Sequence, residues 1–239
     1  MTAINELAPT GKLRAGMNLG NNLFTRKNES GELLGVSVDL MQELAKRLGV
    51  SLEMVIYEQP GQVADDATKD VWDIAILAIE KTRAKTISFS PAMTEIEAGY
   101  VVLQNSTLKS TEEVDAKGMK IAAPEKAGYE LYLTSALKNA SIVRTKNFAS
   151  SIQIFNENKV DAIAGLKPNL IESMHKLPEG MLLQGKFMTV NHGFAIALGK
   201  AAANAYLQNF VNELIKTGFV ASSIEKHQIN GLIAIRAPD

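Results

Sequence analysis

The chain has 239 residues, of which 46% are hydrophobic, and its 25 basic and 26 acidic side chains give a formal net charge of -1. This composition is typical of one large folded domain or two small ones and excludes a disordered chain. The balanced charge argues against nucleic-acid binding and against a polybasic membrane patch. With no cysteine and only three histidines, disulfide scaffolds, cysteine nucleophiles and thiolate zinc sites are excluded, and we expect no metal or cofactor.

Membrane and targeting segments are not expected. The longest uninterrupted apolar run covers residues 74–79, far short of the ~20 residues of a membrane helix. The first residues lack the charged and apolar regions of a signal peptide. Two interpretations stay open, a cytoplasmic protein and the mature form of an exported one.

The first third of the chain alternates predicted strands and helices. Ser37 is expected to cap the first long helix and Gly49 to end it. Trp72, just before a continuous apolar run, is expected in the core. In chain order, the predicted elements are a strand at 12–18, a polar loop at 19–35, a helix at 38–48, a strand at 51–57, a short helix at 61–69 and a buried strand at 73–78.

The same alternation then recurs. Asp73 and Asp161 each begin an apolar strand that follows an amphipathic helix. We therefore predict two similar α/β lobes, each a mainly parallel sheet flanked by helices. The predicted elements of the second lobe are strands at 119–123, 141–144 and 160–165 and helices at 129–137 and 149–158.

The C-terminal tail is predicted to return to the first lobe. It contains a strand at 193–198 and helices at 201–216 and 220–226, and the second lobe already has enough residues for its own core. The predicted lobes are therefore 1–103 with 193–239, and 104–192. Hinge segments are expected near 101–105 and 189–193, with the ligand site in a cleft between the lobes.

Four motifs together resemble the type 3 family of solute-binding proteins, the polar-amino-acid receptors of ABC importers. The resemblance covers the chain from Leu13 to about Gly231. It is carried by Gly31-Glu-Leu-Leu-Gly-Val-Ser-Val-Asp-Leu40, Trp72-Asp-Ile-Ala-Ile-Leu-Ala-Ile-Glu-Lys-Thr-Arg83, Ile87-Ser-Phe-Ser-Pro91 and Val160-Asp-Ala-Ile-Ala164.

The resemblance implies the type II periplasmic-binding-protein fold, two lobes joined by two hinge strands. It also implies a non-catalytic periplasmic receptor that closes on a small carboxylate-containing ligand, an amino acid or a similar molecule. The implied partner is the ABC-transporter permease in the membrane, and the implied state is a monomer.

The resemblance also implies ligand-binding residues. Arg83 matches the arginine that pairs bidentately with the ligand's carboxylate, a geometry that suits the guanidinium fork. Backbone groups of Leu77 and Ala78 are expected to face the ligand. The loop 125–129 matches a loop whose N–H groups hold the same carboxylate at a helix start, which adds Ala127, Gly128 and Tyr129.

Further candidates lie where predicted strands end, the edge at which open α/β sheets bind ligands. They are Asn21 and Asn22 after the first strand and Glu58 after the second. Relatives that bind α-amino acids place an Asp near the position of Leu166, beside Gly165, and an ammonium against leucine would be unpaired. We therefore expect a carboxylate without that ammonium, or one whose cation is held by Glu58, Glu80 or Glu125.

Two alternative functions stay open. Some relatives on this scaffold eliminate water from a cyclic carboxylate, which needs a cleft carboxyl group as general acid, for which Glu58, Glu80, Glu125 or Glu172 are candidates. The other alternative is a ligand-sensing domain without export. The sequence contains no nucleophile–base pair, which favours the receptor.

Overall fold

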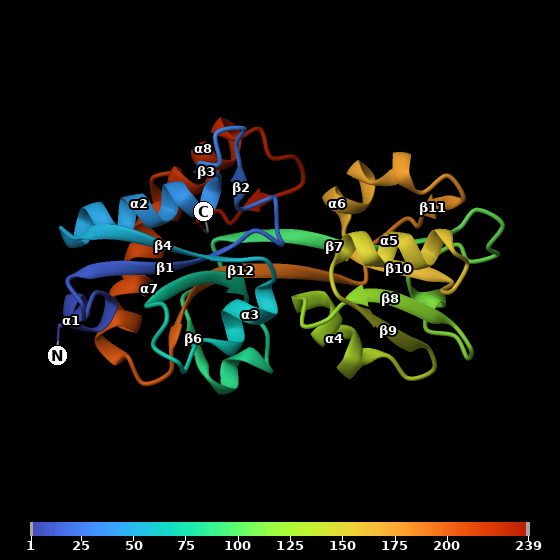
Figure 1. The fold of residues 1–239 in the computed structure, drawn as a ribbon, viewed down its shortest axis with the longest axis horizontal. Coiled ribbons are helices and arrows are strands. Elements are labelled where there is room, and N and C mark those ends of the chain that lie inside the picture. The colour runs from blue at the N-terminus through green and yellow to red at the C-terminus, as the bar shows by residue number, and fades with distance from the viewer. Residues whose placement is uncertain (1, 238–239) are drawn as a thin grey trace. The chain divides into compact units, whose positions relative to one another are not determined.

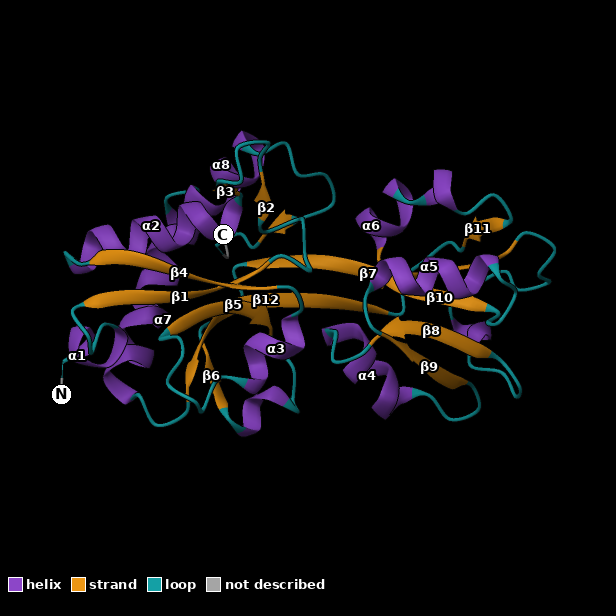
Figure 2. Ribbon diagram, in the orientation of Figure 1, coloured by secondary structure: helices purple, strands orange, loops and turns teal. Residues whose placement is uncertain are grey.

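The computed structural model describes residues 2–237 and divides the chain into two compact units. Unit 1 runs to Glu95 and resumes at Asn191, and unit 2 is Ile96–Val190. The chain passes between the units within strands β7 (Thr94–Leu103) and β12 (Met188–Ala197). The boundaries expected after 103 and after 192 lie in the same two strands and stay predictions. Helices and strands alternate through both units, as Figures 1 and 2 show.

Unit 1 contains a sheet in the order β4-β1-β5-β12. The central strand β1 is parallel to both of its neighbours, and β12 is antiparallel to β5. The short strand β6 pairs with β12, and β13 pairs with the first residues of β7. The bounds are β1 (Lys12–Asn18), β4 (Ser51–Tyr57), β5 (Ile74–Ala78), β6 (Ile87–Phe89) and β13 (Ile233–Ala234).

The long helices of unit 1 agree closely with the predicted ranges, whereas α1 was not predicted and the short helix predicted at 61–69 already ends at Asp65. The predicted helix at 201–216 is confirmed without change as α7, and Gly49 ends α2 in the left-handed conformation, as expected. The polar loop also contains a small hairpin that was not predicted, β2 (Arg26–Lys27) with β3 (Leu33–Leu34). The bounds are α1 (Ala3–Leu7), α2 (Val36–Leu48), α3 (Pro60–Asp65), α7 (Ala201–Lys216) and α8 (Phe219–Lys226), with a 3₁₀ turn η1 (Arg83–Lys85).

The expected cap of α2 is wrong. Gly35, not Ser37, is the N-cap residue, and Ser37 lies buried in the first turn. A backbone carbonyl replaces the side-chain cap, because the N–H of Ser37 donates to the oxygen of Phe24 at 3.1 Å. This approach requires glycine, since a Cβ at Gly35 would lie 2.2 Å from that oxygen, at φ 126°.

Unit 2 repeats the strand order of unit 1 as β9-β8-β10-β7. The central strand β8 is again parallel to both neighbours, and β7 is antiparallel to β10. The bounds are β8 (Lys120–Pro124), β9 (Ser141–Thr145), β10 (Ala162–Leu166) and β11 (Gly180–Leu182), with helices α4 (Gly128–Ala136), α5 (Phe148–Asn156) and α6 (Lys167–Glu172) and 3₁₀ turns η2 (Glu112–Val114) and η3 (Met174–Lys176).

Each unit has its own apolar core between its sheet and its helices. Trp72 is 3% exposed and its indole N–H donates to the oxygen of Val63, which confirms its expected core position. The core cluster of unit 1 comprises Tyr57, Val63, Ala67, Trp72, Ala75, Leu77, Ile87 and Ala195. That of unit 2 comprises Val101, Ala122, Phe155, Val160, Ile163, Leu170 and Leu177.

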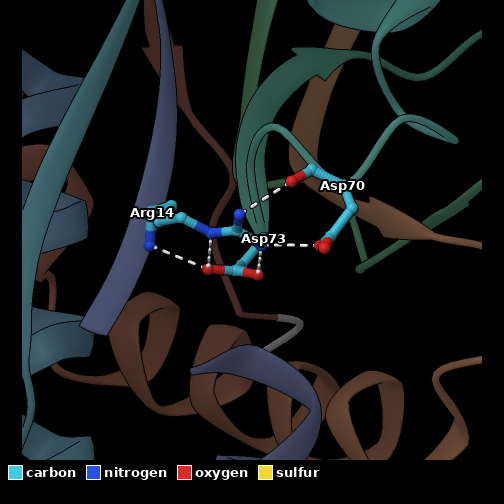
Figure 3. A network of polar contacts seen from close by, with 3 residues as sticks. All are labelled: Arg14, Asp70 and Asp73. Carbon is cyan, nitrogen blue, oxygen red and sulfur yellow. Dashed lines mark hydrogen bonds and ion pairs between the residues drawn. The ribbon is translucent and has the colours of Figure 1, made fainter. Parts of the chain in front are cut away.

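The repeated aspartates occupy the same place in the two sheets. Asp73 donates its N–H to the oxygen of Arg14 and accepts the N–H of Arg14 on Oδ2. Asp161 exchanges the same two bonds with Lys120. In unit 1 the guanidinium of Arg14 adds hydrogen bonds to the carboxylate of Asp73 and also binds Asp70 (Figure 3). Both aspartates therefore hold the amino end of a strand in place, opposite to its carboxyl end.

Candidate functional site

The end of β5 carries the candidate arginine of unit 1. Leu77 and Ala78 are buried, and Arg83, in η1, is 5% exposed. Its Nη1 donates to the oxygen of Ala78 at 3.1 Å. The structure therefore brings three of the predicted residues together, and the backbone of the strand end directly positions the guanidinium.

Glu80 holds the turn on which Arg83 stands. Its Oε2 accepts the N–H of Thr82 at 2.6 Å and the N–H of Arg83 at 3.2 Å. This carboxylate was expected to be available for a ligand cation. In the structure it instead accepts hydrogen bonds from the N–H groups at the start of the 3₁₀ turn.

Burial sets the electrostatics of Arg83. Removal from water lowers the pKa of its guanidinium to about 10, against the attraction of the Glu80 and Asp65 carboxylates. The group is therefore still a cation at neutral pH. A buried cation favours an anionic partner, and a carboxylate matches the planar fork of a guanidinium in both charge and geometry.

The loop after β1 uses its asparagines largely for its own turns. The Oδ1 of Asn21 accepts the N–H of Leu23 at 3.3 Å, and the Oδ1 of Asn18 accepts the N–H of Gly20 at 2.9 Å. Asn21 is half-buried and Asn22 is exposed. Such bonds are the usual role of asparagine in turns. A ligand-binding role for Asn21 and Asn22 stays a prediction.

Glu58 lies beside this loop. The N–H of Leu19 donates to the oxygen of Tyr57 at 2.8 Å, and a Cβ at Gly20 would lie 2.6 Å from the oxygen of Glu58. The two loops that follow β1 and β4 are thus in contact. The side chain of Glu58 is exposed at this edge of the sheet.

Sequence reasoning missed an aromatic pair in unit 1. The rings of Phe24 and His192 lie 4.6 Å apart between centroids, and both residues are about 5% exposed. His192 is the strand partner of Ala78, whose oxygen binds Arg83. His192 could have been singled out from the sequence, because it lies in the expected hinge segment near 189–193. Nothing in the sequence pointed to Phe24.

The loop before α4 carries the candidates of unit 2. Ala127 is the N-cap residue of α4, and Ala127, Gly128 and Tyr129 are all buried. Lys126 has a left-handed backbone with φ 60°. Burial, with a smaller contribution from the neighbouring Glu130, raises the pKa of the Tyr129 phenol. The first N–H groups of α4 therefore follow a left-handed residue, and such groups at the start of a helix can bind an anion.

Gly165 and Leu166 end β10. A Cβ at Gly165 would lie 2.9 Å from Phe148 Cε2 and 3.0 Å from Leu170 Cδ2, so packing requires the glycine. Leu166 is 7% exposed and offers no polar side-chain atom. The structure thus keeps an apolar side chain at the position where the resemblance implied an ammonium acceptor.

A charged cluster adjoins Leu166 and was not predicted. Lys167 and Lys186 donate to opposite oxygens of Glu97, at 2.9 and 3.0 Å. The two ammonium groups hold the pKa of Glu97 below its usual value. Gly99 leaves room for the stem of Lys167, because a Cβ there would lie 3.2 Å from Lys167 Cγ. Two cations therefore surround one carboxylate at this strand end.

Two other kinds of site were sought in the described residues. Among residues 2–237, no three His, Asp or Glu side chains gather so that they could hold a metal ion. Within the same range, none of the helices combines the length and apolar character that crossing a bilayer requires.

Comparison with known proteins shows what the chain is similar to. Residues 13–228 match the family described as bacterial extracellular solute-binding proteins, family 3. The L-cystine-binding protein TcyJ of Escherichia coli K12 is 23% identical over 228 residues, which cover 93% of this chain and 85% of that protein. A probable histidine-binding protein of Campylobacter jejuni is 23% identical over 95% of this chain and 89% of its own.

Solved structures show the same fold. The cysteine-binding protein of Campylobacter jejuni matches with a TM-score of 0.81 at 15% identity, covering 99% of this chain and 100% of that one. ArgBP from T. maritima in its holo form matches with a TM-score of 0.75 at 22% identity, covering 94% and 99%. The predicted fold class, that of the type II periplasmic binding proteins, is thereby confirmed.

Proposed function

The chain belongs to the bacterial extracellular solute-binding proteins of family 3, and we propose that it is the receptor of an ABC importer for a small carboxylate-bearing solute. The named relatives are binding proteins and not enzymes, which supports a non-enzymatic role. The observation that carries the proposal is the buried guanidinium of Arg83, fixed to the end of β5 by the oxygen of Ala78.

Arg83 is suited to bind the solute's carboxylate. Its side chain is anchored through Nη1, and Glu80 fixes its backbone, so little conformational entropy remains to be lost on binding. A bidentate guanidinium–carboxylate pair adds directional hydrogen bonds to the charge attraction. Unit 2 supplies the second set of groups in this proposal, the first N–H groups of α4 after Ala127.

The charges of unit 2 bear on the class of solute. The relatives' names include cystine, histidine and glutamine, all of which carry an α-ammonium group. Here Leu166 offers no acceptor, and Glu97 already has two lysine partners. We therefore propose a carboxylate that lacks the α-ammonium or whose cation binds elsewhere, and a second anionic group would suit Lys167 and Lys186.

The remaining parts of the proposal follow from the family. Family members deliver solute to a membrane permease, so we propose a periplasmic location and a permease as partner. A solute that binds a closed form of the receptor more tightly than an open form would shift the population toward the closed form. The size of this shift is set by the difference in affinity between the two forms. We propose that the receptor acts as a monomer.

A thermal-shift screen tests the function directly. Glutarate, 2-oxoglutarate, other small carboxylates and the standard amino acids would be compared on the wild type, on Arg83→Ala and on Lys85→Ala. Lys85 is exposed on the same turn and is the matched control. A solute at 100 times its Kd adds about 2.7 kcal/mol, and for a chain of this size that raises Tm by several degrees.

The proposal requires a shift in the wild type and in Lys85→Ala that Arg83→Ala lacks. Since Arg83 is buried, Arg83→Lys serves as a second variant, measured by calorimetry at a temperature where circular dichroism shows folded protein. Arg83→Lys keeps the positive charge but loses the planar guanidinium, which can form two parallel hydrogen bonds to a carboxylate. The affinity for the carboxylate should therefore fall about tenfold. Full binding by Arg83→Ala would exclude the proposed role, and a solute consumed over time would indicate an enzyme.

A further inference from the structure

Glu130 is a buried carboxylate in the first turn of α4. Its residue surface is 1% exposed, and a buried carboxylate is costly unless it is fully hydrogen-bonded. Oε1 accepts from Thr134 Oγ1 at 2.8 Å and from Arg144 Nε at 2.9 Å. Oε2 accepts the backbone N–H of Lys126 at 2.9 Å. The side chain thus points back toward the loop that enters the helix.

The bond to Lys126 holds a strained residue. With φ 60°, Lys126 is in the left-handed region, which lowers the population of a residue other than glycine by about tenfold. In an ordinary capping box, a Glu at this helical position binds the N–H of the N-cap residue. Here the N–H of Ala127 donates to Pro124 O at 3.2 Å instead, and Glu130 reaches one residue further back.

Residues of strand β9 also restrain the loop before α4. The N–H of Glu125 donates to the oxygen of Thr145 at 2.9 Å, and the neighbouring Arg144 pairs with Glu130. Arg144 Nη2 also donates to Thr134 Oγ1. The loop is therefore fixed at Glu125 and at Lys126 before the helix begins.

The positive charge of Arg144 also changes the electrostatics at the start of α4. A carboxylate in the first turn of a helix offsets the positive end of the helix dipole and repels an incoming anion. The guanidinium of Arg144, 2.9 Å from Glu130, neutralises this charge. The start of α4 therefore keeps its attraction for an anion although an acidic residue stands within it.

We propose that Glu130 is a positioning residue, which holds the left-handed turn at Lys126 and thereby orients the N–H groups of Gly128 and Tyr129 toward the solute's carboxylate. This inference rests on the proposed function, because only a receptor for an anion uses those groups. It assigns the orienting role to a side chain that is itself too buried to meet the solute.

The test combines a ligand-independent readout with an affinity. NMR would follow amide exchange at Lys126 and the amide chemical shifts of Gly128 and Tyr129 in the wild type, Glu130→Ala and Lys126→Gly/Glu130→Ala. Calorimetry would measure the Kd of glutarate, or of the best carboxylate of the screen, in the same proteins and in Lys126→Gly. Glycine adopts the left-handed turn without strain, so it removes the need for the anchor.

We expect Glu130→Ala to expose the N–H of Lys126 to exchange, to shift the amide resonances of Gly128 and Tyr129, and to weaken carboxylate binding about tenfold. The double variant should bind within about threefold of Lys126→Gly, a rescue that a purely structural role would not give. Unchanged exchange or unchanged affinity in folded Glu130→Ala would overturn the inference, as would a double variant as weak as the single one. If no solute binds the wild type, the proposed function fails, while exchange at Lys126 and the amide shifts of Gly128 and Tyr129 still decide whether Glu130 positions the loop.

Discussion

Asp73 is fully buried and meets Arg14 through both backbone and side chain, with Oδ1 2.8 Å from Nη2 and Oδ2 3.0 Å from Nε. Together with the two backbone bonds, this fixes the start of β5 against β1. The same guanidinium reaches Asp70 at 2.7 Å, but that carboxylate is 84% exposed. One arginine therefore has a buried partner and an exposed partner, which can be compared directly.

The first prediction concerns this comparison. Asp73→Asn should lower the free energy of unfolding by about 3 kcal/mol, because it leaves part of a buried ion pair uncompensated. Asp70→Asn should leave the free energy of unfolding nearly unchanged, as is usual for exposed pairs. Urea denaturation of both variants measures the difference. Equal losses would mean that burial does not determine the strength of this network.

A second prediction tests the carbonyl cap of α2. Gly35→Ala should cost about 3 kcal/mol, because the new Cβ would lie 2.2 Å from the oxygen of Phe24. Gly49→Ala is the control, since its φ is also positive but nothing lies within 4 Å of its Cβ position. It should cost only about 1 kcal/mol. Similar midpoints for the two variants in thermal melts would contradict the close approach.

Glu80 provides a third prediction, about binding. Glu80→Ala removes the acceptor of two N–H groups and should loosen the turn of Arg83, weakening carboxylate binding about tenfold. Glu80→Gln keeps an oxygen acceptor and should bind within about threefold of the wild type. Lys81→Ala, an exposed neighbour, is the control for calorimetry. An unchanged affinity in Glu80→Ala would show that the turn held by Glu80 does not contribute to carboxylate binding.

The fourth prediction addresses the class of solute. Lys167→Met keeps an unbranched stem beside Gly99 and removes the ammonium group from Glu97. We expect affinity for a dicarboxylate such as glutarate to fall about tenfold, while amino acids with an α-ammonium group gain affinity because Glu97 has lost one cation. Lys146→Met, exposed in the same unit, is the control. A parallel loss for both classes of solute would contradict this selectivity.

The fifth prediction is a pH dependence. Burial opposes ionisation of Asp39, but hydrogen bonds from Lys226 and Ser223 outweigh it and hold the pKa of Asp39 below its usual value. Because the folded-state pKa is depressed, the stabilisation is present above the unfolded pKa near 3.9 and is lost as pH falls through the folded value.

Unfolding curves of the wild type and Asp39→Asn between pH 3 and 7 would measure this effect. The gap in free energy between the two proteins should be widest near neutral pH and should shrink in acid. Glu29→Gln, an exposed change in the loop after β2, should follow the wild type throughout. A gap that stays constant down to pH 3 would show that the charge of Asp39 does not stabilise the fold.

Long elements were predictable from the sequence because their apolar spacing repeats. Helix α7 has buried apolar residues at helical spacing from Ala203 to Leu214, and Gly49 ends α2 because it can adopt a left-handed backbone. The short elements α1, β6 and β11 contain too few residues to show a period. Strand β12 begins at Met188, before the predicted start at 193.

The candidate site shows the same limit. Arg83 and Ala78 were singled out from a family motif as ligand-binding residues, but the hydrogen bond between them, which spans five residues, was not predicted. The cluster of Lys167, Glu97 and Lys186 depends instead on the antiparallel pairing of β7 with β10 and on the space left by Gly99. No local pattern reveals such a pairing, and the capping role of Glu80 was likewise invisible without coordinates.

The division of unit 1 into two segments has a consequence for synthesis. When the ribosome has made the residues up to Glu95, β5 still lacks its neighbour β12, and α7, which Glu6 joins through the N–H of Ala203, does not yet exist. Unit 2 is continuous and can fold as soon as it emerges, as domains do during translation. The nascent chain must therefore carry an incomplete first unit with an open strand edge until the last segment arrives, which makes that interval the most aggregation-prone stage of its production.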